Sequence, residues 1–399
     1  MRRWLLPLLV LLPAPLGAAM APAMPGPPLP DRAVLAPDAE AQWVPFELTP
    51  GNQIRFRMTV DGRAATAILD TGFSQSVISR RWATSAGLRI ANGGVGVGVG
   101  GSVAMGQVNG RTLVIGGLTR TGGRLGVLDL PDSATGGDTA IDAVIGSDIL
   151  RAYALDIDFS ARRFRLLPSG RLPFAGQSAP LSLSGRDQLY ISELRVDGTR
   201  LRPMIVDTGD GATIAVSAEA WGALGAAGPA TTTTVSYSVA GAVQSGLAVL
   251  PEVAVGDAAL RQAETLIEPG GGFSARMGAS GRIGIGFLQR FRVLLDPRAG
   301  RMVMAPTPDT DRPPLRSTSG LLLSTQPDRL RVLHVMRGGP AAAGGWQAGD
   351  EICSVDGTAI SAAYARDPIA LWQVAAPGRV VRLGLCGGPV RALTLRNFY

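Results

Sequence analysis

The sequence predicts a mostly β protein built from two pseudo-symmetric lobes and a separate C-terminal domain. Gly (53) and Pro (29) are abundant and aromatic residues make up only 5%, a composition that favours short strands and many turns. Alternating strand patterns recur in two copies, and a further strand pattern begins near residue 316. A chain of 399 residues is also too long for one ordinary core.

The charge pattern and the rarity of two residue types exclude several classes of protein. The formal net charge is +7, but the basic residues are all Arg and are scattered singly, so we expect no nucleic-acid partner. His334 is the only His, and the two Cys both lie near the C-terminus. A metal site or a His-based nucleophile is therefore not expected, and the chemistry must use carboxylates, hydroxyls, backbone groups or Arg.

The N-terminal segment has the pattern of an export signal. Arg2 and Arg3 precede an apolar stretch from Trp4 to Leu16, and small residues follow at a cleavage spacing. We expect a signal peptide over 1–21, a Pro-rich linker over 22–45, and an exported protein that is periplasmic or secreted. No later stretch is long and apolar enough for a membrane span, so the mature chain should contain no integral membrane segment.

One pattern occurs twice in the sequence. It consists of a strand, an Asp-Gly turn and a second strand that ends in Asp-Thr-Gly. The first copy runs from Ile54 through Asp61-Gly62 to Asp70-Thr71-Gly72. The second runs from Leu189 through Asp197-Gly198 to Asp207-Thr208-Gly209. A single Asp-Thr-Gly is a weak signal, because Asp and Gly are common where strands end in turns. Two copies in register form a much stronger one.

Each copy closes with a short apolar strand that ends in glycine and is followed by a helical stretch. In the first copy this element is Val144-Ile145-Gly146, and in the second we matched it to Gly284-Ile285-Gly286. The repeated pattern resembles the retropepsin-like and pepsin-like aspartic peptidases, in which each lobe supplies one Asp-Thr-Gly or Asp-Ser-Gly loop. The resemblance implies a bilobal protein, with retropepsin-like β lobes over 46–168 and 176–306.

The resemblance implies specific roles for the two loops. Asp70 and Asp207 would be the catalytic carboxylates, and Thr71 and Thr208 would hydrogen-bond across the pair. The adjacent Gly72 and Gly209 lack a Cβ and let the loops approach closely. Two carboxylates about 3 Å apart share one proton, so one can activate water as a base while the other acts as an acid.

This chemistry predicts an aspartic endopeptidase that hydrolyses polypeptides in the cell envelope with no cofactor and no metal. Both carboxylates come from one chain, and we expect a monomer. Two positions depart from the family pattern, since Phe73 and Asp210 follow the glycines where a small residue is usual. They motivate an alternative, a non-catalytic protein that binds peptides through its cleft and its C-terminal domain.

Two hairpins are candidates for flaps over the substrate. The glycine-rich run at 93–101, including Gly96 and Gly98, lies where the family places its flap. In the second copy Tyr237 is near the tip of a predicted hairpin over 231–247. Tyr237 could cover the scissile bond or could equally pack across the strands.

The segment 316–399 resembles a PDZ domain. Gly320, Leu321 and Leu322 look like the loop that binds a peptide carboxylate, and Ala348-Gly-Asp-Glu-Ile352 looks like the most specific element. The resemblance implies that peptide or protein C-termini bind at a sheet edge. The alternative is a structural appendage in which Leu321 and Leu322 are core residues. His334 is expected on a strand of this domain, far from the carboxylates.

The two cysteines lie in candidate strands of the same domain. Cys353 and Cys386 could form a disulfide in an exported protein. A small buried thiol also packs well in a strand, and free Cys is among the most buried residue types. We expect two buried free thiols.

Overall fold

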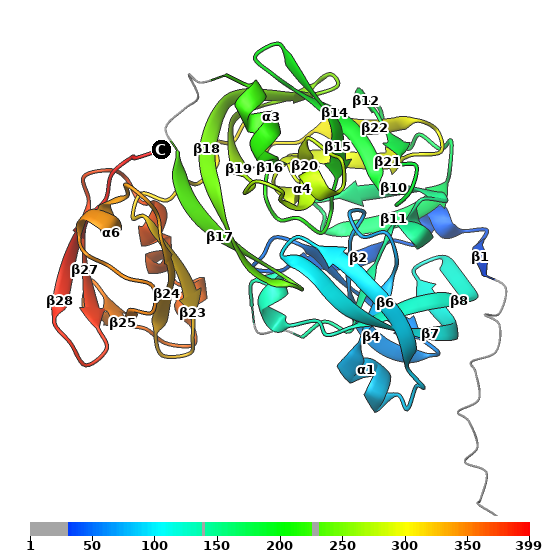
Figure 1. Cartoon of the computed structure of the whole chain (residues 1–399), viewed down its shortest axis with the longest axis horizontal. Coiled ribbons are helices and arrows are strands. Elements are labelled where there is room, and N and C mark those ends of the chain that lie inside the picture. Colours follow the sequence, from blue (N-terminus) through cyan, green and yellow to red (C-terminus); the bar gives the residue numbers. More distant parts are fainter. Residues whose placement is uncertain (1–30, 138–139, 226–230) are drawn as a thin grey trace, which may run out of the picture.

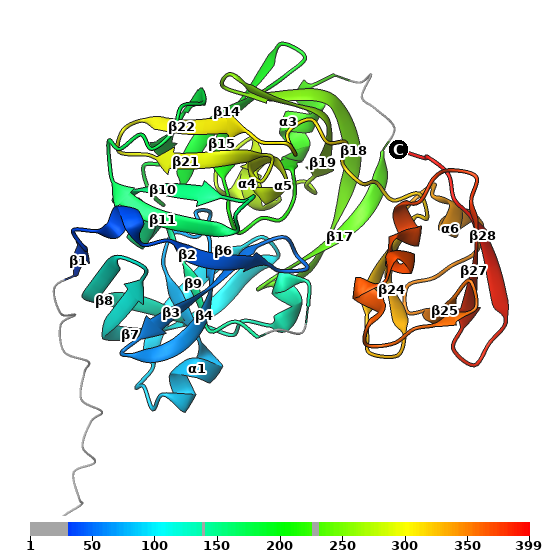
Figure 2. The same ribbon diagram turned by 180° about the vertical axis from the view of Figure 1, so that it is seen from behind.

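The computed structural model describes residues 31–137, 140–225 and 231–399 (Figure 1). The expected signal peptide over 1–21 and the first part of the linker lie outside these residues. The described chain is mostly β, with 48% strand and 12% helix. It forms three sheets, two of which make up the body of the molecule while the third stands at its side (Figures 1 and 2).

The first sheet carries the first Asp-Thr-Gly loop. Strands β3 and β4 pair antiparallel across the Asp61-Gly62 turn, where both residues adopt the positive φ of a tight hairpin. Strand β4 then pairs parallel with β9, and β9 pairs antiparallel with β5. The strands of this half are β1 (Arg32–Leu35), β2 (Val44–Leu48), β3 (Ile54–Val60), β4 (Arg63–Leu69), β5 (Val77–Ser79), β6 (Ala91–Gly98), β7 (Gly101–Ile115), β8 (Leu118–Leu128), β9 (Ala143–Ile145), β10 (Tyr153–Asp158) and β11 (Arg163–Pro168).

The second half uses the same pairing order. Strands β14 and β15 pair antiparallel across the Asp197-Gly198 turn, β15 pairs parallel with β20, and β20 pairs antiparallel with β16. Its strands are β12 (Gln177–Pro180), β13 (Ser182–Leu183), β14 (Tyr190–Val196), β15 (Thr199–Val206), β16 (Ile214–Val216), β17 (Thr232–Ser238), β18 (Gly241–Val255), β19 (Ala258–Ile267), β20 (Gly281–Ile283), β21 (Phe291–Asp296) and β22 (Arg301–Pro306).

Short helices follow equivalent strands in the two halves. Ser79 caps α1 (Arg80–Ser85) and Ser217 caps α3 (Ala218–Ala223), each by accepting a hydrogen bond from a backbone N–H of the first turn. The remaining helices of the two halves are η1 (Ala39–Ala41), η2 (Asp132–Thr135), α2 (Ser147–Leu150), α4 (Phe273–Arg276) and α5 (Ile285–Leu288).

The two halves share one sheet at their base. Strand β10 of the first half pairs antiparallel with β21 of the second, with Leu155 opposite Leu295. Beside this seam the buried Asp156 accepts charge-assisted hydrogen bonds from Arg165 and Arg292 at 2.9 and 3.0 Å. Because a single hydrophobic cluster runs through both halves, their relative position is set by packing as well as by strand pairing.

The C-terminal segment has its own sheet and its own hydrophobic core. The core is built around Trp372, which is fully buried and donates a hydrogen bond to Tyr364 Oη at 2.9 Å. The elements of this segment are β23 (Leu321–Thr325), β24 (Leu330–Val335), α6 (Pro340–Ala343), β25 (Glu351–Val355), β26 (Thr358–Ala359), η3 (Tyr364–Arg366), η4 (Pro368–Val374), β27 (Val380–Leu385) and β28 (Val390–Thr394).

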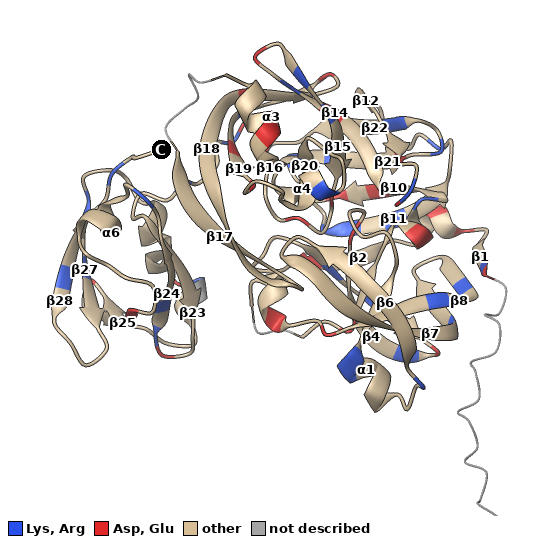
Figure 3. Ribbon diagram, viewed as in Figure 1, with Lys and Arg blue, Asp and Glu red and all other residues tan. Residues whose placement is uncertain are grey.

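Charged residues are dispersed over the molecule. Figure 3 shows basic residues distributed along both halves and on the C-terminal sheet. Within the described ranges, no helix is long and apolar enough to cross a membrane.

The structure corrects our expectation for the two cysteines. Cys353 and Cys386 form a disulfide, with Cα atoms 5.0 Å apart. Strands β25 and β27 pair with Ile352 opposite Leu385, and the Cys386 amide donates to the Glu351 carbonyl at 3.0 Å. This pairing brings the two Cβ atoms into bonding range, which spacing in the sequence could not reveal.

We expect the disulfide to stabilise the C-terminal segment. It closes a loop with a sequence separation of 33, for which chain entropy gives about 3–4 kcal/mol. Cys353→Ala/Cys386→Ala should lower the unfolding temperature of the C-terminal segment without altering the rest of the chain. Hydrogen exchange during heating locates the loss. Alkylation of the denatured, unreduced wild-type protein is the control, and two alkyl adducts there would contradict the bridge.

Candidate active site

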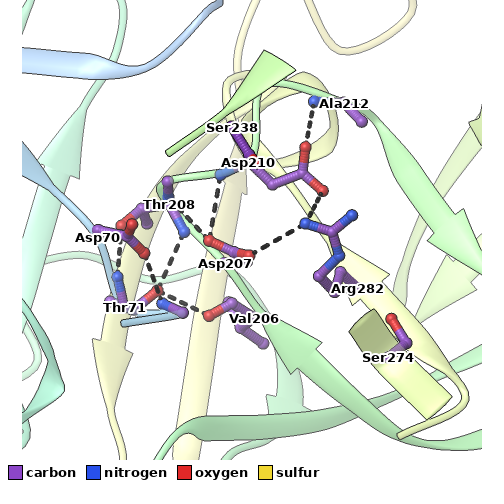
Figure 4. A network of polar contacts seen from close by, with 12 residues as sticks. Asp70, Thr71, Val206, Asp207, Thr208, Asp210, Ala212, Ser238, Ser274 and Arg282 are labelled. Atoms are coloured by element: carbon purple, nitrogen blue, oxygen red, sulfur yellow. Dashed lines mark hydrogen bonds and ion pairs between the residues drawn. The ribbon is translucent and has the colours of Figure 1, made fainter. Parts of the chain in front are cut away.

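The two Asp-Thr-Gly loops begin where the paired strands β4 and β15 end. The Asp70 amide donates to the Ile145 carbonyl at 2.9 Å, and the Asp207 amide donates to the Ile283 carbonyl at the same distance. Each loop therefore starts from a backbone hydrogen bond to the end of the neighbouring parallel strand. The loops from the two halves lie side by side, with Asp70 and Thr71 next to Asp207 and Thr208 (Figure 4).

The two threonines exchange hydrogen bonds across the pair. Thr71 Oγ1 donates to the Val206 carbonyl at 2.7 Å and accepts from the Thr208 amide at 3.1 Å. Thr208 Oγ1 does the same in return, donating to the Leu69 carbonyl at 2.9 Å and accepting from the Thr71 amide at 3.0 Å. Both side chains are fully buried, so these four bonds form without competition from water.

The glycines allow each carboxylate to lie against the opposite loop. A Cβ on Gly72 would overlap the carboxylate of Asp207, and a Cβ on Gly209 would overlap that of Asp70. Each glycine amide also donates to the carboxylate of its own loop at 2.9 Å. The structure thus brings together all six residues that the sequence predicts for the two loops.

The environment of the carboxylates raises their pKa values. Burial raises the pKa of Asp70 well above its usual range, and the charge of Asp207 and a hydrogen bond with it raise this pKa further. Burial also raises the pKa of Asp207, while Arg282 opposes that shift and Asp210 adds to it. A close pair of this kind holds one proton between two oxygens over a wide pH range.

The structure corrects the register of the second copy. Gly284, rather than Gly286, is the counterpart of Gly146, because both precede the first residue of a short helix with the same extended backbone. A Cβ would lie 2.5 Å from the Phe73 carbonyl oxygen at Gly146 and 2.7 Å from the Asp210 carbonyl oxygen at Gly284. Backbone crowding therefore selects this glycine, whereas two glycines spaced by one residue were indistinguishable in the sequence.

The corrected register reveals a residue that the sequence analysis missed. Ile68 pairs with Val144 in the first half, and Ile205 pairs with Arg282 in the second, so Arg282 occupies the position of an apolar residue. Arg282 is buried and forms ion pairs with Asp210 at 3.0 Å, Glu268 at 3.3 Å and Asp207 at 3.6 Å. The unusual Asp210 after the second Asp-Thr-Gly was the signal that could have prompted a search for a cationic partner.

Comparisons with known proteins agree with this geometry. Residues 56–149 match a family model described as aspartyl protease, and residues 310–378 match one described as PDZ domain. The chain contains an aspartyl protease domain and a C-terminal PDZ domain. The first match ends before the second Asp-Thr-Gly, whose likeness to the first comes from the internal repeat. A search of curated proteins finds no significant match.

Two hairpins form beside the aspartyl protease site. Strands β6 and β7 enclose the glycine-rich run with Gly96 and Gly98, and β17 and β18 carry Tyr237 opposite Ala242. The Gly100 amide at the tip of the first hairpin donates to Ser238 Oγ of the second at 3.2 Å. No hydrogen bond joins Tyr237 to either carboxylate among the residues described, and the flap roles stay predictions.

In the PDZ domain, amides of the loop that we expect to bind a peptide carboxylate already donate hydrogen bonds to serine side chains. The Gly320 amide donates to Ser317 Oγ at 3.0 Å and the Leu321 amide donates to Ser319 Oγ at 3.2 Å. Leu321 is a core residue and Leu322 lies opposite His334 on β24. Strand β23 remains at the end of the described sheet order, which is where an extended peptide adds a strand.

His334 contacts the aspartyl protease domain through the β17 hairpin. Its Nε2 lies 2.9 Å from Thr233 Oγ1, and Thr232 Oγ1 donates to the Arg337 carbonyl at 2.8 Å. His334 is on a strand of the PDZ domain, as expected, and its neighbour is the second hairpin. Within the part of the chain that the structure describes, no cluster of His, Cys, Asp and Glu forms a metal site.

We expect Thr71→Ala to destabilise the aspartyl protease domain. It leaves the buried Val206 carbonyl and Thr208 amide without the Thr71 hydroxyl, at a cost of about 1–3 kcal/mol per unsatisfied group. Thr71→Ser keeps the hydroxyl and is the matched control. Chemical denaturation measures both free energies of unfolding, and equal losses in the two variants would mean that the methyl group rather than the hydrogen bonds stabilises the loop.

We also expect the glycine run at 93–101 to exchange its amide hydrogens faster than any other part of the two halves. Val95 there is 70% exposed, and the tip is held mainly through side-chain contacts. A transition-state mimic should slow this exchange, because a flap closes over bound ligand. Hydrogen exchange with mass spectrometry provides the measurement, and unchanged rates with bound mimic would remove the flap assignment.

Proposed function

We propose that this protein is an aspartic endopeptidase in which Asp70 and Asp207 activate water for hydrolysis of polypeptides. The observation that carries the proposal is the exchange of hydrogen bonds between the Thr71 and Thr208 loops, which holds the half-buried Asp70 and the buried Asp207 next to each other. A buried acid pair that retains one proton can act as a base and as an acid in the same step. The aspartyl protease domain supports a protease-type function.

The reaction needs only the protons of this pair and one water. The ionised carboxylate takes a proton from water as the water oxygen bonds to the peptide carbon, and the protonated carboxyl gives its proton to the carbonyl oxygen. The tetrahedral intermediate then returns a hydroxyl proton to the second carboxylate. The first carboxyl protonates the nitrogen as the carbon–nitrogen bond breaks, which restores the original proton count.

The PDZ domain and the N-terminal segment extend the proposal. A PDZ domain suggests peptide binding, and we propose that the edge of β23 holds C-terminal segments of proteins near the cleft. We place the protein in the cell envelope or outside the cell on the pattern of residues 1–21. The disulfide between Cys353 and Cys386 supports an oxidising compartment.

Asp70→Asn and Asp207→Asn should each reduce cleavage of an unfolded protein substrate by at least about 10³-fold, because the amide cannot exchange the shared proton. Asp197→Asn makes the same change at an exposed turn and should leave the rate unchanged. The assay follows new N-termini by mass spectrometry, with circular dichroism to check that each variant folds.

Near wild-type cleavage by either catalytic variant would show that the two-carboxylate mechanism is wrong. Peptide binding without cleavage by the wild-type protein would instead favour the non-catalytic alternative.

A further inference from the structure

The surroundings of the two carboxylates differ in charge. In the first half Phe73 and Val144 pack in one apolar cluster. In the second half the equivalent positions hold Asp210 and Arg282, which form an ion pair at 3.0 Å. The first half therefore has an apolar pair of residues at these positions, and the second half has a charged pair.

Arg282 is held between carboxylates on several elements. Its guanidinium lies 3.6 Å from Asp207 and pairs with Asp210 and with Glu268, which directly follows β19 and accepts hydrogen bonds from Ser274. The side chain is 6% exposed and its Cζ lies 5.4 Å from the centre of the Phe273 ring. Among the ion pairs of the described residues, none involves Asp70.

The backbone amides that donate to the two carboxylates also differ in number between the two halves. Asp207 Oδ1 accepts from the amides of Gly209 at 2.9 Å and Asp210 at 3.1 Å, whereas Asp70 Oδ1 accepts from the Gly72 amide alone. The Phe73 amide donates to the Asp70 main-chain carbonyl at 3.3 Å, and the equivalent Asp210 amide donates to the Asp207 main-chain carbonyl at the same distance and also to Asp207 Oδ1. Donors to a carboxylate favour its ionised form, so both amide and guanidinium geometry favour charge on Asp207.

We propose that Arg282 is a positioning residue that keeps Asp207 ionised and leaves the shared proton on Asp70. This inference rests on the proposed function and deepens it by assigning the roles. Asp207 is then the general base that takes the proton from water, and Asp70 is the general acid that protonates the carbonyl oxygen. Asp210 and Glu268 hold the guanidinium in place, and Asp210 partly offsets its effect on Asp207.

The pKa shifts agree with this assignment. Arg282 lowers the pKa of Asp207 against the effect of burial, and the charge of Asp207 and burial both raise the pKa of Asp70. Burial alone would lower the pKa of Arg282, but the charges of Asp210, Asp207 and Glu268 raise it above its usual value, so the guanidinium keeps its charge.

Carbon-13 NMR of the full chain labelled at the Asp carboxyl carbon tests the assignment directly. The resonances of Asp70 and Asp207 are those that disappear in Asp70→Asn and Asp207→Asn. As the pH rises, we expect Asp207 to ionise before Asp70. Ionisation of Asp70 first, or of both together, would overturn the proposal.

Two variants test the part played by Arg282. Arg282→Met should raise the ionisation midpoint of Asp207 by about 1–3 pH units, since a cation within 4–6 Å lowers a carboxyl pKa by that amount. Asp210→Phe/Arg282→Val places the apolar pair of the first half in the second and avoids an unpaired Asp210. In both variants the acidic limb of the kcat/KM profile should move to higher pH, which a purely structural defect would not produce.

The outcomes separate this inference from the proposed function. The NMR titration needs no turnover, so it decides the roles of Asp70 and Asp207 even if the protein cleaves no peptide. If wild-type protein cleaves peptides and both variants keep the wild-type midpoints, Arg282 has no positioning role and the proposed function stands.

Discussion

The hydrogen bonds that Thr71 and Thr208 exchange are the constraint on which the site depends. Each hydroxyl bridges from its own loop to the backbone of the other half, at 2.7–3.1 Å. The loops can approach this closely only because Gly72 and Gly209 carry no side chain. The cross-bonded loops, together with the β10–β21 seam, fix the positions of the two carboxylates relative to each other.

A symmetric scaffold carries an asymmetric electrostatic environment. The strands around the two loops pair in the same order, so Asp70 and Asp207 occupy equivalent positions at the strand ends. The side chains do not, because a guanidinium takes the place of a valine in the second half. A buried guanidinium with three carboxylate neighbours is the charge that distinguishes the second half from the first.

The second hairpin links the two functional parts of the chain. Strand β17 contacts Gly100 of the first hairpin at its tip and His334 of the PDZ domain near its start. The same strand therefore contacts both the glycine-rich hairpin and the strand next to β23.

The sequence by itself determined the β class, the repeat and the two Asp-Thr-Gly loops. Alternating strands, Asp-Gly turns and a close-approach glycine depend on local geometry that a few adjacent residues specify. Only the tertiary structure decided that Gly284 rather than Gly286 matches Gly146, that Cys353 and Cys386 are bonded, and that Arg282 faces Asp207. Each of these depends on distances between segments far apart in the chain, which sequence spacing does not encode.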